Sequence, residues 1–253
     1  MLLTVLFAAE GCRHSRARAH VAVNPEFANL TREQIFERGE QQYAHRKYAK
    51  ARTYYQNVYE NYPNDPLGRR SLLRIADTYF MQGNAVNLVE AQYKYRDFIN
   101  RYPGSENGDY AMLQIAMVSY KQMERPDRDQ QKTREAVEKF QDMIRAYPRS
   151  PLRADADKRL QEAFDHLARH EQIVAAFYMK RRSFDAAVRR LNYLIDTYPN
   201  YPDRASVFYD LATSLERLGR KGEARLYYER VLTEFPKSTY ADRARKRLTE
   251  LKA

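Results

Sequence analysis

Two histidines at helical spacing come closest to forming a chemical site in this chain. His166 and His170 lie four residues apart, so on a helix both rings would face the same side, with Glu171 nearby. A protein-bound zinc ion usually has three or four protein ligands, and two histidines on a solvated helix face are common by chance. We therefore expect neither a metal site nor a cofactor.

The acidic and nucleophilic residues do not form a catalytic pattern either. Asp155 and Asp157 are two residues apart, which would place them on different faces of a helix and does not suit paired acid–base work. The sequence contains no Gly-rich phosphate loop, no His-Glu-x-x-His and no Gly-x-Ser-x-Gly. We predict that the protein is not an enzyme.

The single cysteine, Cys12, follows a short apolar segment at residues 1–9. This segment is too short to span a bilayer and resembles a bacterial lipoprotein signal, in which the cysteine is acylated and becomes the mature N-terminus. Glu10 is unusual two residues before such a cysteine, and no Lys or Arg precedes the apolar run, which is consistent with a translation start further upstream. We expect a signal peptide at residues 1–11, a lipidated Cys12 and a tether at residues 12–30; a free thiol is the alternative.

The elements that would position all these residues repeat along the chain. Five helix-like segments end in an aromatic residue followed by proline, with alanine twelve residues before the proline and apolar residues, mostly bulky, eight and five before it. This order matches the second helix of a tetratricopeptide repeat (TPR), in which a small residue lets two helices approach and proline ends the helix. The five alanines are Ala51, Ala91, Ala136, Ala187 and Ala224.

Small residues also mark the first helix of four of the pairs. Gly39 and Ala212 lie twelve residues before their alanines, whereas Ala76 and Ala116 lie 15 and 20 residues before theirs. The second and third repeats therefore carry insertions of three and eight residues between their helices. The pattern predicts an all-α fold, a TPR solenoid of five helix pairs with a C-terminal capping helix.

The expected domain is residues 31–253, with N-terminal repeats at 31–148 and C-terminal repeats at 149–253. Thr31 and Gln34 predict a capping box at its first helix. The stretch from 152 to 182 has neither Gly nor Pro, which leaves open one long helix or two in tandem. The other expected helices are 32–45, 48–61, 67–82, 87–101, 107–123, 132–146, 184–198, 203–218, 221–234 and 239–252.

Basic side chains outnumber acidic ones, 44 to 33, and they concentrate toward the C-terminus. Residues 216–253 carry eleven basic and six acidic side chains, and a second basic cluster lies within residues 180–190. Such a surface can attract acidic partners or anionic lipid head groups, or it can be a solvated helix face. We expect no nucleic-acid binding, because no recognised module and no interleaving of glycine with aromatic residues is present.

Several segments resemble the BamD family, lipoprotein subunits of the outer-membrane β-barrel assembly machinery. They are AYPRSPLRADADKRL at 146–160, LARHE at 167–171, VAAFYMKR at 174–181 and RPDRDQ at 125–130. The resemblance covers nearly the whole chain from about Phe27. It implies a scaffold anchored by lipid at the periplasmic face of the outer membrane. Family members bind the barrel subunit, and sometimes smaller accessory lipoproteins, through their C-terminal half, and their N-terminal repeats are thought to receive unfolded outer-membrane proteins.

Two candidate surfaces follow from the repeat register and the resemblance. The partner-binding patch comprises Arg217, Arg220, Arg225 and Arg230. The client-peptide groove comprises Phe36, Glu40, Tyr43, Arg70, Leu73, Asp77, Phe80, Leu113 and Met117. In it, apolar side chains would receive a client's last strand and Arg70 would attract its terminal carboxylate. Alternatively these side chains complete the core or touch the tether, and the protein is another periplasmic TPR lipoprotein that coordinates envelope or peptidoglycan synthesis.

Overall fold

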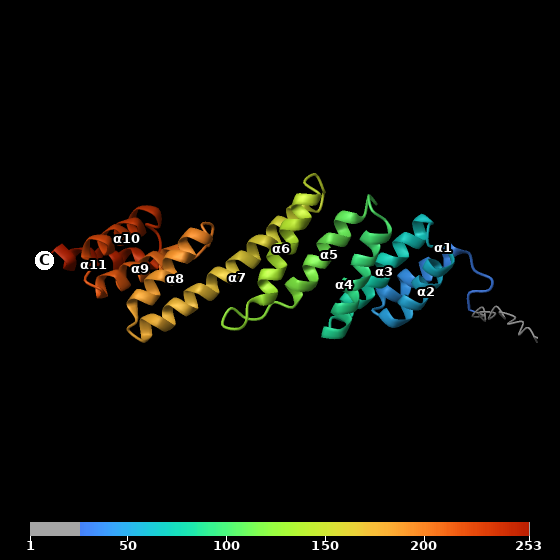
Figure 1. Ribbon diagram of the computed structural model, residues 1–253, viewed down its shortest axis with the longest axis horizontal. Helices are drawn as coiled ribbons and strands as arrows, with labels where there is room; N and C mark the ends of the chain where they lie inside the picture. Colours follow the sequence, from blue (N-terminus) through green and yellow to red (C-terminus); the bar gives the residue numbers. More distant parts are fainter. Residues whose placement is uncertain (1–25, 253) are drawn as a thin grey trace, which may run out of the picture.

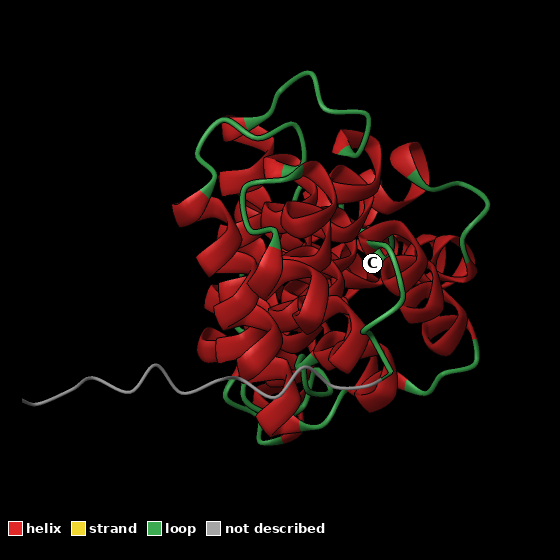
Figure 2. Ribbon diagram, turned by 90° about the vertical axis from the view of Figure 1, so that its right-hand side faces the viewer, coloured by secondary structure: helices red, strands yellow, loops and turns green. Residues whose placement is uncertain are grey.

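The protein is an elongated stack of antiparallel helices. A computed structural model describes residues 26–252, and within this range the chain forms eleven helices and no strand. Figure 1 shows the helices following one another along the long axis, and Figure 2 shows the stack from one end. The helices pair as α1–α2, α3–α4, α5–α6, α7–α8 and α9–α10, with α11 packed on α10. This confirms the predicted all-α TPR solenoid.

The observed helix bounds agree with the expected ones to within two residues. The helices are α1 (Arg32–Ala44), α2 (Tyr48–Asn61), α3 (Pro66–Gln82), α4 (Ala85–Arg101), α5 (Gly108–Lys121), α6 (Gln131–Ala146), α7 (Arg153–Lys180), α8 (Phe184–Thr197), α9 (Arg204–Arg217), α10 (Lys221–Glu234) and α11 (Thr239–Lys252). The largest difference at a helix start is at α4, which begins two residues early because the Asn84 side chain accepts a hydrogen bond from the Asn87 N–H.

Helix ends follow from local chemistry. At the start of α1, Thr31 and Gln34 exchange the two hydrogen bonds of a capping box, as predicted. Each second helix from α2 to α10 ends at an aromatic residue whose N–H donates to the carbonyl four residues earlier, and proline comes next. Proline disfavours helical backbone at the residue before it and lacks an N–H of its own, so the helix ends at the aromatic residue.

The predicted packing residues lie in the core. All five repeat alanines are fully buried, as are the apolar residues four and seven positions after each of them. At Gly39 the two helices approach so closely that even a Cβ atom does not fit, since it would lie 2.7 Å from Cε1 of Tyr55. Small residues therefore set the separation of the paired helices, and the predicted repeat register is confirmed.

A single long helix connects the two halves of the stack. α7 is one continuous helix of 28 residues that contacts both α6 and α8, which resolves the alternative left open by the sequence. Its buried Ala156 belongs to a cluster of apolar residues with α5 and α6, whereas Ala168 and Ala175 belong to a cluster with α8 to α11. The core is thus a row of four apolar clusters along the chain, not one centre.

Within residues 26–252, no helix combines the length and apolar character needed to cross a bilayer.

The packing alanines give a direct test of the register. Replacing Ala136 or Ala187 with leucine should lower the free energy of unfolding by about 1 to 3 kcal/mol, because the added methylenes overpack a closed helix contact. The matched control is Ala176→Leu on the exposed side of α7, which should change stability by no more than about 0.5 kcal/mol. Thermal or denaturant melts that do not separate the two core variants from this control would contradict the register.

Candidate functional site

Arg74 of α3, which the sequence did not single out, is the centre of a hydrogen-bond network in the N-terminal repeats. The network lies on the face formed by α1, α3 and α5. Arg74 Nε donates to Glu40 Oε1 at 2.6 Å, and a second guanidinium nitrogen pairs with the other oxygen of the same carboxylate. Arg74 Nη1 also donates to Asp77 Oδ2 at 3.2 Å. One cation therefore joins two carboxylates from α1 and α3.

Tyrosine hydroxyls complete the hydrogen bonding of both carboxylates. Tyr95 and Tyr110 donate to Asp77 Oδ1 at 2.6 and 2.8 Å, and Tyr55 donates to Glu40 Oε1 at 2.6 Å. The Arg74 guanidinium also lies over the Tyr43 ring, 4.2 Å from its centroid. The network thus links all five helices from α1 to α5. We call Glu40, Tyr55, Arg74, Asp77, Tyr95 and Tyr110 the Arg74 network.

Burial and pairing shift the pKa values of the two carboxylates in opposite directions. Burial works to raise the pKa of Glu40, but the hydrogen bonds from Arg74 and Tyr55 outweigh it and hold this pKa below its usual value. At Asp77, which is 4% exposed, burial prevails over its hydrogen bonds and raises the pKa. Burial also raises the pKa of Tyr43 to about 12, with the nearby Asp77 charge adding to the shift.

A shallow hollow lies beside this network. It measures about 320 Å³ and is lined by Arg70, Leu73, Arg74, Asp77, Asn107 and Tyr110. Arg74 is committed to its two carboxylates, whereas Arg70 is exposed and makes no ion pair with any residue from 26 to 252. The Arg70 guanidinium lies 5.0 Å from the centroid of the Phe36 ring. The hollow therefore offers one available cation beside polar and apolar walls.

The predicted groove residues divide into two groups. Phe36, Leu73 and Leu113 are only 6%, 4% and 3% exposed, and they fill the apolar clusters between helices. Tyr43, Phe80 and Met117 are partly buried, and Glu40 and Asp77 belong to the Arg74 network. Half of the apolar groove residues therefore complete the core, as the alternative interpretation expected, and the other half remain partly accessible.

The four arginines of the partner-binding patch also differ from one another. Arg220, which directly precedes α10, pairs with Glu223 at 2.7 Å, and Arg230 of α10 pairs with Glu234 at 2.6 Å. Arg230 additionally lies 4.2 Å from the centroid of the Phe208 ring, so part of its role is packing. Arg217 and Arg225 are exposed and have no ion pair within the described chain. These two carry the free positive charge of the patch.

The two helically spaced histidines hold a loop. A ring nitrogen of His166 lies 2.5 Å from the Glu124 carbonyl oxygen, and a ring nitrogen of His170 lies 2.7 Å from that of Pro126. Both rings thereby fasten the insertion between α5 and α6 onto α7. The described residues contain no cluster of three or more His, Cys, Asp or Glu side chains able to hold a metal ion. Cys12 and the tether up to residue 25 lie outside the described residues.

The sequence of this repeat array is similar to that of known proteins. A family model described as YfiO, an outer membrane lipoprotein, matches residues 28–229. The chain is 26% identical over 195 residues to the outer membrane protein assembly factor BamD of Rickettsia prowazekii, covering 77% of this chain and 76% of that protein. It is 29% identical over 210 residues to the BamD factor of Neisseria meningitidis serogroup A, covering 78% and 76%.

A solved TPR structure also aligns along most of the chain. The TPR2AB domain of yeast Sti1, in a complex with pHSP90, aligns with a TM-score of 0.46 and 16% identity, covering 87% of this chain and 82% of that one.

The Arg74 network should contribute measurably to stability. Arg74→Met leaves the half-buried Glu40 and the buried Asp77 without their cation and should cost about 2 to 4 kcal/mol at pH 7. Because the folded-state pKa of Glu40 is lowered, its ion pair stabilises the fold above the unfolded-state pKa and is lost as pH falls through the folded-state value. The difference between parent and variant should therefore shrink in acid.

Denaturant melts at neutral and acidic pH measure both effects. Adding Glu40→Gln to Arg74→Met should recover part of the loss, because one unpaired carboxylate is removed. Arg128→Met, at an exposed arginine of the α5–α6 loop that makes no ion pair within residues 26–252, is the control. An Arg74→Met variant as stable as this control would show that the network contributes nothing.

Proposed function

Because the chain belongs to the YfiO family of outer membrane lipoproteins, to which the resemblance with BamD had pointed, we propose that it is a scaffold for assembling outer-membrane β-barrel proteins. The family match over residues 28–229 carries this proposal. In a solenoid, neighbouring repeats bury one another's apolar faces, and the stack presents extended surfaces that can bind other chains. The proposed role is non-enzymatic, and needs binding surfaces and an anchor, not a reacting group.

The client site is the hollow beside the Arg74 network. Its free cation, Arg70, suits the terminal carboxylate of an unfolded barrel protein, and a side chain of the client's last strand can rest on the exposed edge of Tyr110 and Asn107. The Arg74 network keeps the neighbouring charges paired, so an incoming carboxylate meets Arg70 without having to break the Glu40 ion pair. The buried groove residues act as the packed floor that holds these groups in place.

The partner site is the C-terminal patch, which would bind the barrel subunit of the machinery. Its free charge lies at Arg217 and Arg225, and Arg217 lines a hollow together with Lys180 and Arg182. A basic surface attracts an acidic one over several ångströms and so raises the rate of encounter. Accessory lipoproteins are further candidate partners of this half.

The anchor is the acyl group on Cys12, which would hold the protein at the periplasmic face of the outer membrane. The multiple acyl chains of a lipoprotein cysteine give stable attachment where a single chain would not. Phe27, at the end of the expected tether, is buried against Tyr54 and belongs to the core of the first repeat, so the free tether would run from Cys12 only to about residue 25. Such a tether would leave the repeats free to reach clients and partners.

Client binding can be tested with a peptide that copies the last strand of an outer-membrane barrel protein. Arg70→Gln in the full chain should weaken its binding by about tenfold, because a charge-assisted hydrogen bond to the terminal carboxylate is lost. The same peptide with an amidated C-terminus should bind weakly to both proteins. Fluorescence anisotropy measures the affinities, with Arg128→Gln as the control; equal affinity of Arg70→Gln and parent for the free-acid peptide would remove this site.

Partner binding predicts unequal effects within the basic patch. Replacing Arg217 and Arg225 with Gln should slow association with the barrel subunit roughly threefold to tenfold at low salt, since the steering charge is lost. Replacing both members of the Arg220–Glu223 and Arg230–Glu234 ion pairs with Gln should have a smaller effect, because the net charge then stays the same. Stopped-flow or surface-binding kinetics would measure the rates. If the first pair of substitutions leaves the low-salt rate unchanged, the patch is not the docking surface.

Anchoring can be tested by fractionation of cells. Cys12→Ala should move the protein from the membrane to the soluble periplasmic fraction, because no described helix can take over as an anchor. The measurement is made in cells that lack the barrel partner, so that binding to it cannot retain the variant. Equal retention of Cys12→Ala and parent in the outer-membrane fraction would refute lipid anchoring through this residue.

A further inference from the structure

The second repeat carries an unusual concentration of exposed apolar side chains. Val86, Val89 and Tyr93 on α4 are 74%, 62% and 60% exposed. Their spacing of three and four residues places them along one side of the helix, and Arg96 continues the same stripe. Contiguous exposed apolar surface of this kind usually marks a place where another molecule binds.

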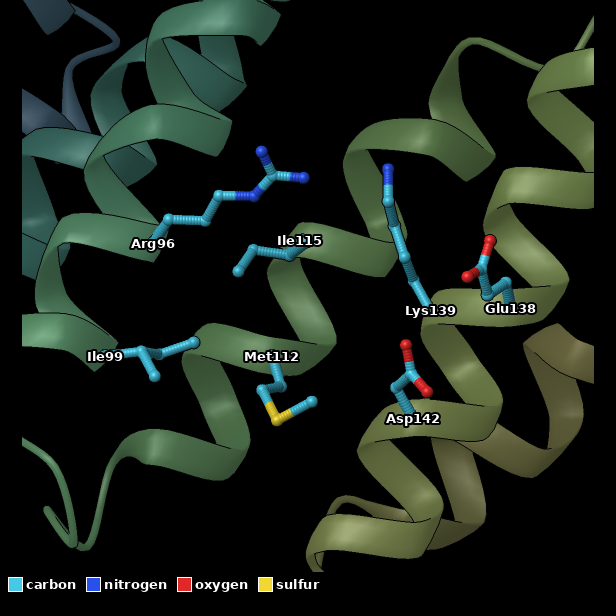
Figure 3. Close-up of a pocket in the computed structure, with 7 residues that line it drawn as sticks. All are labelled: Arg96, Ile99, Met112, Ile115, Glu138, Lys139 and Asp142. Carbon is cyan, nitrogen blue, oxygen red and sulfur yellow. The ribbon is translucent and has the colours of Figure 1, made fainter.

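This stripe leads into a hollow of about 400 Å³ between α4, α5 and α6 (Figure 3). Ile99 of α4 with Met112 and Ile115 of α5 form its apolar floor, and Glu138, Lys139 and Asp142 of α6 form the opposite wall. Arg96 stands at the edge of the hollow on the α4 side. We call the stripe and the hollow together the α4–α6 surface.

The charges around the hollow are separated. In Figure 3, Arg96 and Lys139 extend on one side of Ile115, and Asp142 lies on the other side, near Met112. The Glu138 carboxylate lies beyond Lys139, away from Arg96. Arg96 is exposed and has no ion pair or side-chain hydrogen bond within residues 26–252. Lys139 Nζ donates to the Ser119 hydroxyl at 2.5 Å and lies 3.7 Å from a carboxylate oxygen of Glu135 on its own helix. Burial lowers the pKa of Lys139 and the positive charge of Arg96 adds to the shift, against the Glu135 charge, so the two cations are close enough to repel. An incoming carboxylate would relieve that repulsion.

The α4–α6 surface is separate from the proposed client site. Tyr110 of α5 lines the hollow beside the Arg74 network, whereas Met112 and Ile115 of the same helix line this one. Two helical positions correspond to a rotation of about 200°, so the two hollows lie on opposite sides of α5. A molecule bound at one leaves the other accessible.

We infer that the α4–α6 surface is the docking site for an amphipathic helix of a partner protein. The helix would lay apolar side chains along Val89 and Tyr93 and into the hollow over Ile99, Met112 and Ile115. An acidic residue at its edge would lie between Arg96 and Lys139. The exposed stripe covers about two turns of α4, which is enough for a second helix to pack along it. Arg96 and Lys139 lie at one end of the stripe and would fix the direction in which the partner helix lies.

A pair of synthetic helical peptides tests this assignment. Both carry leucines at helical spacing along one face; one has glutamates along one edge of that face, and the other has lysines there. The parent protein should bind the glutamate peptide at least tenfold more tightly than the lysine peptide. Arg96→Glu should reverse this preference, and Tyr93→Glu should weaken binding of both peptides, because it places a charge on the apolar stripe.

Anisotropy titrations with the full chain measure these affinities, and melting curves establish that each variant is folded. Leu226→Glu, at an exposed apolar position of α10, is the matched control and should bind as the parent does. The assignment is overturned if the parent shows no saturable binding of the glutamate peptide, or if Arg96→Glu leaves the preference between the peptides unchanged. Neither result bears on the client site, because Arg70 and Arg74 are intact in every variant.

Discussion

Close contact between paired helices at small residues is the constraint on which the rest of this structure depends. Each repeat places a fully buried alanine where its two helices meet, and the bulky residues one and two turns further on fill the space around that contact. Because every pair is closed in this way, each repeat offers its neighbour a similar face, and the array grows in one direction. An elongated body with long open sides is the direct consequence.

The same close packing explains why the proposed client site is polar and local. Because the helices are so close together, Phe36, Leu73 and Leu113 are buried in the core. Charged and hydroxyl groups therefore remain on the face formed by α1, α3 and α5. There Arg74, its two carboxylates and three tyrosines satisfy one another, which rigidifies the surface around the unpaired Arg70. At the other end of the long helix α7, Arg217 and Arg225 are exposed and carry positive charge without an ion pair among the described residues. One continuous helix therefore separates the proposed client site from the proposed partner site.

The sequence predicted the fold almost completely, because its signals are local. Tyr-Pro and Phe-Pro mark the helix ends, and the alanine spacing reports on contacts within a single helix pair. The candidate site was less accessible to such reasoning. Arg74 reaches Glu40 across 34 residues, and Tyr95 and Tyr110 reach Asp77 from two other helices, so no spacing rule connects them. The only local signal was the separation of three residues between Arg74 and Asp77.

The histidine pair His166 and His170 also has partners that the sequence could not predict. Its spacing correctly indicated two rings on one helix face, but their partners are backbone carbonyl oxygens of the α5–α6 loop, more than forty residues away along the chain. Every residue has a backbone carbonyl, so the residue types do not show which carbonyl oxygen will accept a hydrogen bond. Only the folded chain shows that these rings hold the α5–α6 loop against α7.

The central claim, that this scaffold serves the assembly of outer-membrane β-barrel proteins, is tested most directly by depleting it in its own cells. The measurement is the amount of folded barrel protein in the outer membrane, read from the different gel mobility of folded and heat-denatured forms. The account predicts that folded barrels decline soon after depletion, while soluble periplasmic proteins stay constant. Unchanged folded barrels, together with a primary defect in the peptidoglycan, would contradict it and favour a role in envelope synthesis.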